Sequence, residues 1–226
     1  MSRVVVATYT HEWSGIVIDL MRSLRHVRGM YTFIYHQERQ NCHKNMAAVV
    51  EEAQGTGADF LVLVDTDVVI LDEWWLGHLM HPFNASGGEK VGIVGCLEAK
   101  TEDQLRHRAF HMPPRGETGE VIPCPVYTDF WIPAYTMAFR LPFEFQVDTE
   151  IPGDMGMTDV DLCFQAHKAG KKVVVAQSTT VYHPQKSEEW EQKMAPIQRG
   201  WYVHQVRHMV EKWGTEFFER HYRRTA

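Results

Sequence analysis

Several features that mark common protein classes are scarce or missing in this sequence of 226 residues. It has four cysteines, widely spaced and without a Cys-x-x-Cys pair, which excludes the usual zinc-binding spacing and a dense disulfide framework. No apolar run approaches the length of about 18 residues that a transmembrane helix needs. The formal net charge is -6, so the field of the whole molecule does not favour nucleic acid or an anionic membrane.

The same features give an expectation for the organisation of the chain. Only Arg3 precedes the first short apolar run, so we expect no signal peptide, and we expect reduced thiols and a cytoplasmic location. With 44% hydrophobic residues, the chain is long enough for one substantial core. We expect one large domain over residues 1–186 and a helical C-terminal extension, residues 187–226, packed on it.

The spacing of apolar residues predicts an α/β fold. Strands are expected at residues 3–8, 31–35 and 60–64, with helices between them at 14–26 and 44–54. This alternation is typical of a Rossmann-like, mostly parallel sheet flanked by helices. Further strands are expected at 91–97, 127–140 and 171–176, a helix at 158–170, and a long loop near the site at 99–125.

Two carboxylates follow the most apolar of these strands. The stretch 59–72 reads DFLVLVDTDVVILD, in which Asp65 and Asp67 come directly after the strand. Ligands of open α/β sheets bind beyond the carboxyl ends of the strands, and Mg²⁺ and Mn²⁺ prefer oxygen ligands. The pair therefore predicts a divalent metal site, with an acidic turn as the alternative. Thr66, between them, is expected at the same edge.

Polar residues also follow the first strand. Thr8, Tyr9 and Thr10 lie at its carboxyl end, where a nucleotide could bind, although ordinary strand-end residues have the same composition. His183 follows a predicted strand, and a His there can be a metal ligand, a proton carrier or a polar edge residue.

The helix predicted at residues 158–170 carries two carboxylates near its start. Thr158 and Asp161 have the spacing of a capping box, and Gly170 suits the other end. Asp159 falls in the first turn, where the helix dipole favours the ionised carboxylate. Such a group can accept a proton from a substrate hydroxyl. The alternative is that Asp159 and Asp161 only stabilise the helix N-terminus.

The order of these motifs resembles a known enzyme family. The Asp-x-Asp motif is followed about 90 residues later by TDVDLCFQAHKAGKKVVVAQSTTVYHP. This resembles the GT-A fold inverting glycosyltransferases, the large family that includes cellulose and chitin synthases. Their usual form is Glu-Asp-x-Asp-Leu, a helix, Ala-Gly, a strand and a His. The resemblance covers residues 3–184, with Thr158 in place of the Glu and Tyr35-His36-Gln37 in place of the usual Asn/Asp-Gly-Ser-x-Asp.

The resemblance implies roles for the motif residues. Asp65 and Asp67 match the motif for the metal and the sugar-nucleotide diphosphate, and His183 matches the additional metal ligand of some members. Thr8 and Tyr9 fall where the family holds the nucleotide.

The resemblance also implies an activity. Asp159 matches the catalytic base, and Asp161 is its neighbour in the same motif. We assign Asp161 and Trp131 as candidate acceptor-binding residues. The expected protein is a glycosyltransferase that moves a sugar from a nucleotide-sugar to an acceptor hydroxyl by single displacement, with Mn²⁺ or Mg²⁺ as cofactor.

Two other functions are compatible with the same residues. One is a non-catalytic sugar-nucleotide or glycan binder. Another is a metal-dependent nucleotidyltransferase, which would more naturally show a basic, Gly-rich loop after the first strand than ATYTHEWSG. The acceptor is expected to be a saccharide or small molecule. A hydroxylated base in DNA is the minority alternative, because residues 199–226 interleave basic and aromatic residues, although their apolar spacing favours a docked helix.

Overall fold

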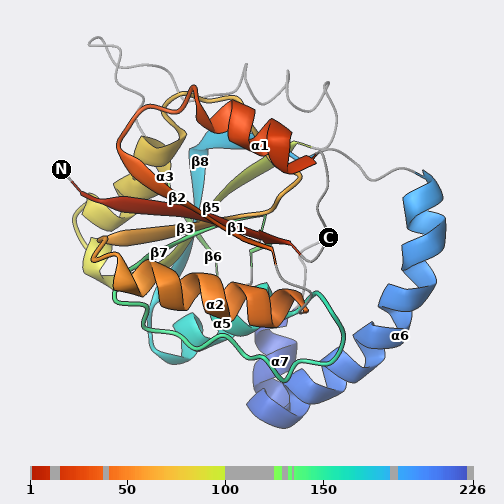
Figure 1. Cartoon of the computed structure of the whole chain (residues 1–226). Helices are drawn as coiled ribbons and strands as arrows, with labels where there is room; N and C mark the ends of the chain where they lie inside the picture. Colours follow the sequence, from red (N-terminus) through yellow and green to blue (C-terminus); the bar gives the residue numbers. More distant parts are fainter. Residues whose placement is uncertain are drawn as a thin grey trace.

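The computed structural model describes most of the chain, namely residues 2–10, 16–37, 41–99, 125–128, 132–133, 135–183 and 188–222. Helices cover both faces of a central sheet of eight strands (Figure 1). The strands are β1 (Val4–Thr10), β2 (Tyr31–Gln37), β3 (Phe60–Val64), β4 (Val69–Ile70), β5 (Val91–Ala99), β6 (Pro125–Thr128), β7 (Thr136–Arg140) and β8 (Lys172–Tyr182). The helices are α1 (Ile16–Leu24), α2 (Cys42–Gly55), α3 (Trp75–Asn84), α5 (Thr158–Lys168), α6 (Glu188–Trp213) and α7 (Thr215–Tyr222), with a 3-10 turn, η1, at Gly88–Lys90.

The sheet follows the order β2-β1-β3-β7-β5-β8-β4, and β6 pairs with β8. β1 is parallel to β2 and β3, which confirms the predicted β-α-β-α-β opening. β7 is antiparallel to both of its neighbours, β3 and β5, and β4 and β6 are antiparallel to β8. Since β5 and β8 are parallel, β1, β2, β3, β5 and β8 point one way and β4, β6 and β7 the other. The sheet is therefore mostly parallel, as expected.

β3 lies between two apolar layers. Phe60, Val62 and Val64 join the cluster with α1 and α3, whereas Leu61 and Leu63 join the cluster with α2 and α5. Successive residues of a strand point to opposite faces, so a strand that is apolar throughout must be covered on both sides. Figure 1 shows α1 and α3 on one side of the sheet and α2 and α5 on the other.

Some predicted elements have different limits. The segment 127–140, expected as one strand, contributes to two, β6 and β7. The apolar residues 171–176 and 181–182 belong to one long strand, β8. Most of the loop predicted at 99–125 lies outside the described residues.

The predicted capping box at the start of α5 is wrong. The N-cap residue is Met157, in a left-handed conformation with φ 61°, and it makes no side-chain cap hydrogen bond. Thr158 is the first helical residue, and its Oγ1 lies 2.5 Å from Nδ1 of the buried His43 in α2. The hydroxyl therefore joins two helices instead of capping one.

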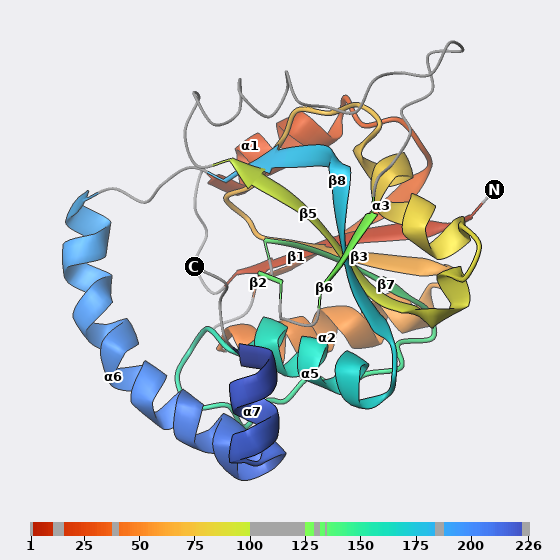
Figure 2. The same cartoon turned by 180° about the vertical axis from the view of Figure 1, so that it is seen from behind.

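The C-terminal helices pack under α5. Met209 of α6 and Phe218 of α7 are buried in a cluster with Phe164 of α5, and the ring centroids of Phe164 and Phe218 are 5.9 Å apart. α7 lies beside α5, while α6 extends away along the edge of the molecule (Figures 1 and 2). Each helix within the described residues is too short or too polar to span a bilayer.

A glycine lets α6 approach the loop before α5. Gly153 has φ +91°, and a Cβ there would lie 2.7 Å from Cγ of Trp201. We predict that Gly153→Ala lowers the free energy of unfolding by at least about 2 kcal/mol, because it adds a left-handed strain to a steric clash.

Gly200 provides a matched control in the same helix as Trp201. It lies inside α6, and a Cβ there meets nothing within 4 Å, so Gly200→Ala should raise the free energy of unfolding by up to about 1 kcal/mol. Urea denaturation of both variants measures the difference. Equal stability of Gly153→Ala and the unmodified chain would contradict this docking of α6.

Candidate functional site

The candidate site lies where the carboxyl ends of parallel strands meet. β1, β3, β5 and β8 all end at the same edge of the sheet, because they point in one direction. Asp65 directly follows β3 and His183 directly follows β8. The backbone N–H of His183 donates to the carbonyl of Ala99, the last residue of β5, at 2.9 Å.

Three residues predicted from separate motifs come together here. Asp65, Asp67 and His183 each offer one ligand atom, and these atoms lie within 4.8 Å of one another. Nε2 of His183 is 3.2 Å from Oδ1 of Asp67. All three residues are half-buried, so the cluster opens to solvent. Two carboxylates and one imidazole form a donor set that suits Mn²⁺, and the side chains present fit a divalent cation.

The short strand β4 explains how Asp67 reaches His183. Val69 of β4 pairs antiparallel with Tyr182 of β8, which folds the turn after β3 back onto the end of β8. The turn is closed by the N–H of Val68, which donates to the carbonyl of Asp65 at 3.3 Å. This pairing brings Asp67, in the turn after β3, next to His183 at the end of β8.

Tyr9 connects this cluster with the candidate base. Burial raises the pKa of Tyr9, and the negative charges of Asp65 and Asp159 raise it further, so the phenol stays protonated near neutral pH. Both carboxylates must lie close enough to Tyr9 to act on the same hydroxyl. Asp159 is the second residue of α5 and half-buried, as predicted for the first turn, and its Oδ1 accepts from the N–H of Val160 at 2.9 Å.

Cys42, the first residue of α2, is also affected by the charge of Asp65. Burial raises the pKa of its thiol to about 11, with contributions from the charges of Asp65 and Asp154. Its backbone N–H donates to the carbonyl of Asp154 at 2.8 Å. The start of α2 is therefore tied to the loop that leads into α5.

The other residues predicted to bind the nucleotide differ in how far they are buried. Thr66 is half-buried between the two aspartates. Thr8 is fully buried, and its Oγ1 has no hydrogen-bond partner among the described residues. The side chain of Thr10 and the whole of Trp131 lie outside what the structure describes.

The surroundings of Asp161 argue against the predicted catalytic or acceptor-binding role. Its side chain is fully buried, accepting from Nε1 of Trp213 at 2.8 Å and pairing with Nζ of Lys212 at 2.9 Å. Gln165, one turn further along α5, also donates to it at 2.7 Å. Because the carboxylate faces α6 and is surrounded by donors, it has no exposed oxygen for an acceptor. Its contacts instead join α6 to α5.

Sequence reasoning missed two residues that contact His183. Oε1 of Glu98 lies 2.6 Å from its Nδ1, and the Tyr135 ring centroid lies 5.9 Å from that of the imidazole. Glu98 stands one position beyond the strand expected at 91–97 and belongs to no motif. Its only signal was a charge next to a long apolar run.

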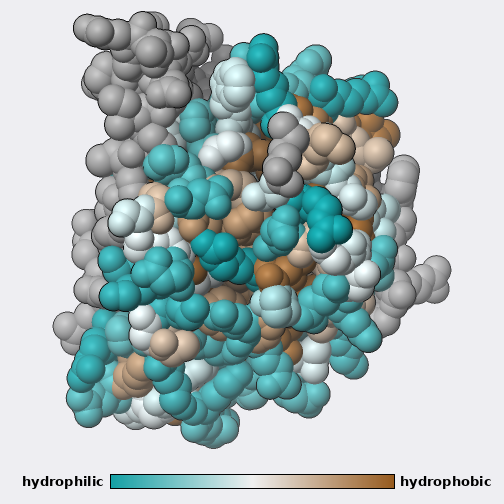
Figure 3. Space-filling view, turned by 90° about the vertical axis from the view of Figure 1, so that its left-hand side faces the viewer, coloured by the Kyte–Doolittle hydropathy of each residue, from teal (hydrophilic) through white to brown (hydrophobic). Residues whose placement is uncertain are grey.

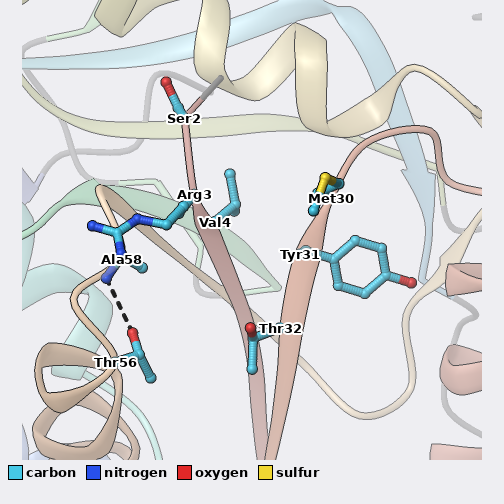
Figure 4. A pocket seen from close by; sticks show the side chains of 8 residues that line it. All are labelled: Ser2, Arg3, Val4, Met30, Tyr31, Thr32, Thr56 and Ala58. Atoms are coloured by element: carbon cyan, nitrogen blue, oxygen red, sulfur yellow. Dashed lines mark hydrogen bonds between the residues drawn. The ribbon is translucent and has the colours of Figure 1, made fainter.

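A separate hollow of about 380 Å³ lies at the opposite end of the sheet. Arg3, Met30 and Tyr31 line it near the amino ends of β1 and β2 (Figure 4). Figure 3 shows this side of the molecule, where apolar side chains surface between hydrophilic ones. The lining of this hollow contains none of the predicted site residues.

Comparisons with known proteins agree with this topology. The sequence matches no family model and no curated protein sequence. Among solved structures, A197 from STIV covers 81% of this chain and 86% of its own, with 12% identity and a TM-score of 0.51. A mannosyltransferase from Pyrobaculum calidifontis, PcManGT, in complex with GDP-Man and Mn²⁺, covers 92% of this chain, with 12% identity and a TM-score of 0.58. GalNAc-T7 with UDP, GalNAc and Mn²⁺ covers 83%, with 11% identity and a TM-score of 0.59.

This chain has a GT-A-like fold. The similarity spans 62% of the mannosyltransferase and 44% of GalNAc-T7, so both contain further parts that this chain does not match. At these levels of identity the likeness concerns the fold alone, and the activity has to be argued from the residues at the sheet edge.

The buried contacts of Asp161 make a prediction about stability. Asp161→Asn should lower the free energy of unfolding by about 2–3 kcal/mol, because it removes the charge that accepts from Lys212 and Trp213. Glu216→Gln is the control, since the Glu216–Arg220 pair is exposed and worth less than about 1 kcal/mol. Urea denaturation measures both. An Asp161→Asn protein of unchanged stability but without activity would restore the catalytic assignment.

Proposed function

We propose that this protein is a metal-dependent glycosyltransferase that moves a sugar from a nucleotide-sugar to an acceptor hydroxyl with inversion of the anomeric carbon. The observation that carries the proposal is the meeting of Asp65, Asp67 and His183 at the carboxyl edge of the sheet. The complexes of the two transferases of similar fold, with UDP and Mn²⁺ and with GDP-Man and Mn²⁺, support the use of a divalent metal and a nucleotide-sugar, whereas the inversion rests on the residues of this chain.

Asp65, Asp67 and His183 would hold a divalent cation. When bound, such a cation supplies a Lewis acid that neutralises charge on the departing nucleoside diphosphate. Burial and the charge of Asp65 both contribute to the raised pKa of Tyr9, and this raised pKa keeps the phenol a hydrogen-bond donor. It is therefore suited to donate to a phosphate or sugar oxygen at this edge.

Asp159 is the proposed base. The bond between the anomeric carbon and the diphosphate oxygen breaks while the acceptor oxygen bonds to the opposite face of that carbon, which is oxocarbenium-like in between. The hydroxyl proton passes to Asp159, and the bonding electrons leave with the diphosphate. One displacement inverts the configuration, and the chain needs no covalent nucleophile.

The acceptor we favour is a saccharide or another small hydroxyl compound. The DNA alternative rested on the basic residues of 199–226 and on the aromatic residues interleaved with them, whose rings would stack on bases. Trp213 and Phe217 instead stack edge-on against Phe164, and Trp213 also donates to Asp161. These two rings stabilise the docking of α6 and α7, so they are not available to stack on bases.

A donor panel tests the proposal. Incubation with nucleotide-sugars and Mn²⁺ should release nucleoside diphosphate slowly even without an acceptor, and a chelator should stop the release. Asp65→Ala or Asp67→Ala should abolish it, because each removes a carboxylate of the cluster. Continued release of nucleoside diphosphate by the variant with both substitutions, in the presence of a chelator, would refute the metal-dependent mechanism.

Asp159→Asn tests the base. Turnover should fall by about two to four orders of magnitude, the usual scale for general-base catalysis, with donor affinity and fold unchanged. Glu150→Gln, an exposed carboxylate in the loop before α5, is the control and should be fully active. NMR of the product should show the inverted anomer. Retention of configuration, or near-normal turnover of Asp159→Asn, would be evidence against this mechanism.

A further inference from the structure

We propose that Glu98 is a positioning residue that fixes the orientation and the tautomer of His183 in the metal site. The inference rests on the proposed metal-dependent function and extends it to a residue that belongs to no recognised motif.

The two ring nitrogens of His183 have different partners. Nδ1 lies 2.6 Å from Oε1 of Glu98, whereas Nε2 lies 3.2 Å from Oδ1 of Asp67. Asp67 belongs to the cluster of ligand atoms, and Glu98 lies on the other side of the ring. The side chains of Glu98 and His183 are 18% and 20% exposed, so their contact is largely shielded from water.

This arrangement decides which nitrogen can bind a cation. A neutral imidazole has one nitrogen that donates and one that accepts, and only the second can ligate a metal. A carboxylate accepts hydrogen bonds, so Glu98 selects the form with the proton on Nδ1. The lone pair then resides on Nε2, which faces Asp67 of the cluster. Histidine ligands commonly donate their other N–H to a carboxylate, which fixes the ring and raises its basicity.

The rest of the ring is held from two further directions. The backbone N–H of His183 donates to Ala99, next to Glu98. The Tyr135 ring lies 5.9 Å from the imidazole at an interplanar angle of 32°, and its hydroxyl donates to the carbonyl of Cys96 at 3.0 Å. Rotation of the imidazole is therefore limited by its backbone, by Tyr135 and by Glu98, and Glu98 contacts the ring nitrogen that Asp67 does not.

A register shift in the sheet brings Glu98 within reach. Cys96 pairs with Ala176, but the next residue, Leu97, pairs with Thr180, so β8 contains three extra residues at this point. As a result Glu98 lies opposite Val181, two positions before His183. In the unshifted register it would lie opposite Ser178, further from the end of β8. Bulges of this kind often re-aim side chains beside active sites.

Mn²⁺ affinity, measured by calorimetry without nucleotide, tests the inference. Glu98→Ala should weaken binding about 10- to 100-fold, the usual effect of removing the partner of a ligating His. Glu98→Gln should lose less, because the amide oxygen can still accept from Nδ1. Glu52→Gln is a matched control, since Glu52 also pairs with a histidine, His36, at 2.5 Å but outside the cluster. The Mn²⁺ affinity of this variant should equal that of the unmodified protein.

A double-variant comparison separates positioning from direct ligation. If Glu98 acts through His183, then Glu98→Ala should cause no further loss of Mn²⁺ affinity in a His183→Ala protein. An additional loss there would make Glu98 a ligand in its own right and overturn the inference. Glu98→Gln keeps the test decisive if Glu98→Ala fails to fold.

The outcomes also distinguish this inference from the proposed function. If the unmodified protein binds Mn²⁺ and both Glu98 variants bind it equally well, only the role of Glu98 is refuted. If the unmodified protein binds no Mn²⁺, the metal-dependent function fails and the role of Glu98 fails with it.

Discussion

The burial of β3 on both faces is the constraint on which the site depends. Its residues alternate between two apolar clusters, so the strand can neither rotate nor slip by one residue without exposing half of its side chains. Asp65 follows at once, and its N–H donates to the carbonyl of Tyr135 at 3.2 Å. The position of the candidate metal ligands is therefore determined by packing in the core, and the ligands themselves can remain half-exposed.

A second support comes from the C-terminal helices. Asp148, in the loop that leads to α5, accepts from Lys212 of α6 at 2.7 Å, and Lys212 also pairs with Asp161. Burial raises the pKa of Asp148, but hydrogen bonds from His208 and Lys212 outweigh this and bring it to about 2. The carboxylate thus stabilises the fold above its ordinary pKa, and this contribution is lost as pH falls from about 4 to about 2. Through this network, α6 holds the helix that carries Asp159.

Local patterns predicted much of this structure from the sequence. The apolar run before Asp65 gave the central strand, and the resemblance of two motifs correctly grouped Asp65 and Asp67 with the distant His183. What failed depended on contacts between distant segments. Thr158 bonds to His43, Glu98 reaches His183 only through a register shift, and Asp161 is enclosed by α6. No local spacing encodes such contacts, so their residues could be recognised only in three dimensions.

The central claim is that a divalent cation binds at the edge formed by β3, β4 and β8. The most direct measurement is a crystal structure of the protein soaked with Mn²⁺, with data collected for the anomalous signal of manganese. The account predicts one dominant anomalous peak within coordination distance of Asp65, Asp67 and Nε2 of His183. A dominant peak at the Asp148 and His208 pair, or a cluster without any peak at a saturating Mn²⁺ concentration, would contradict it.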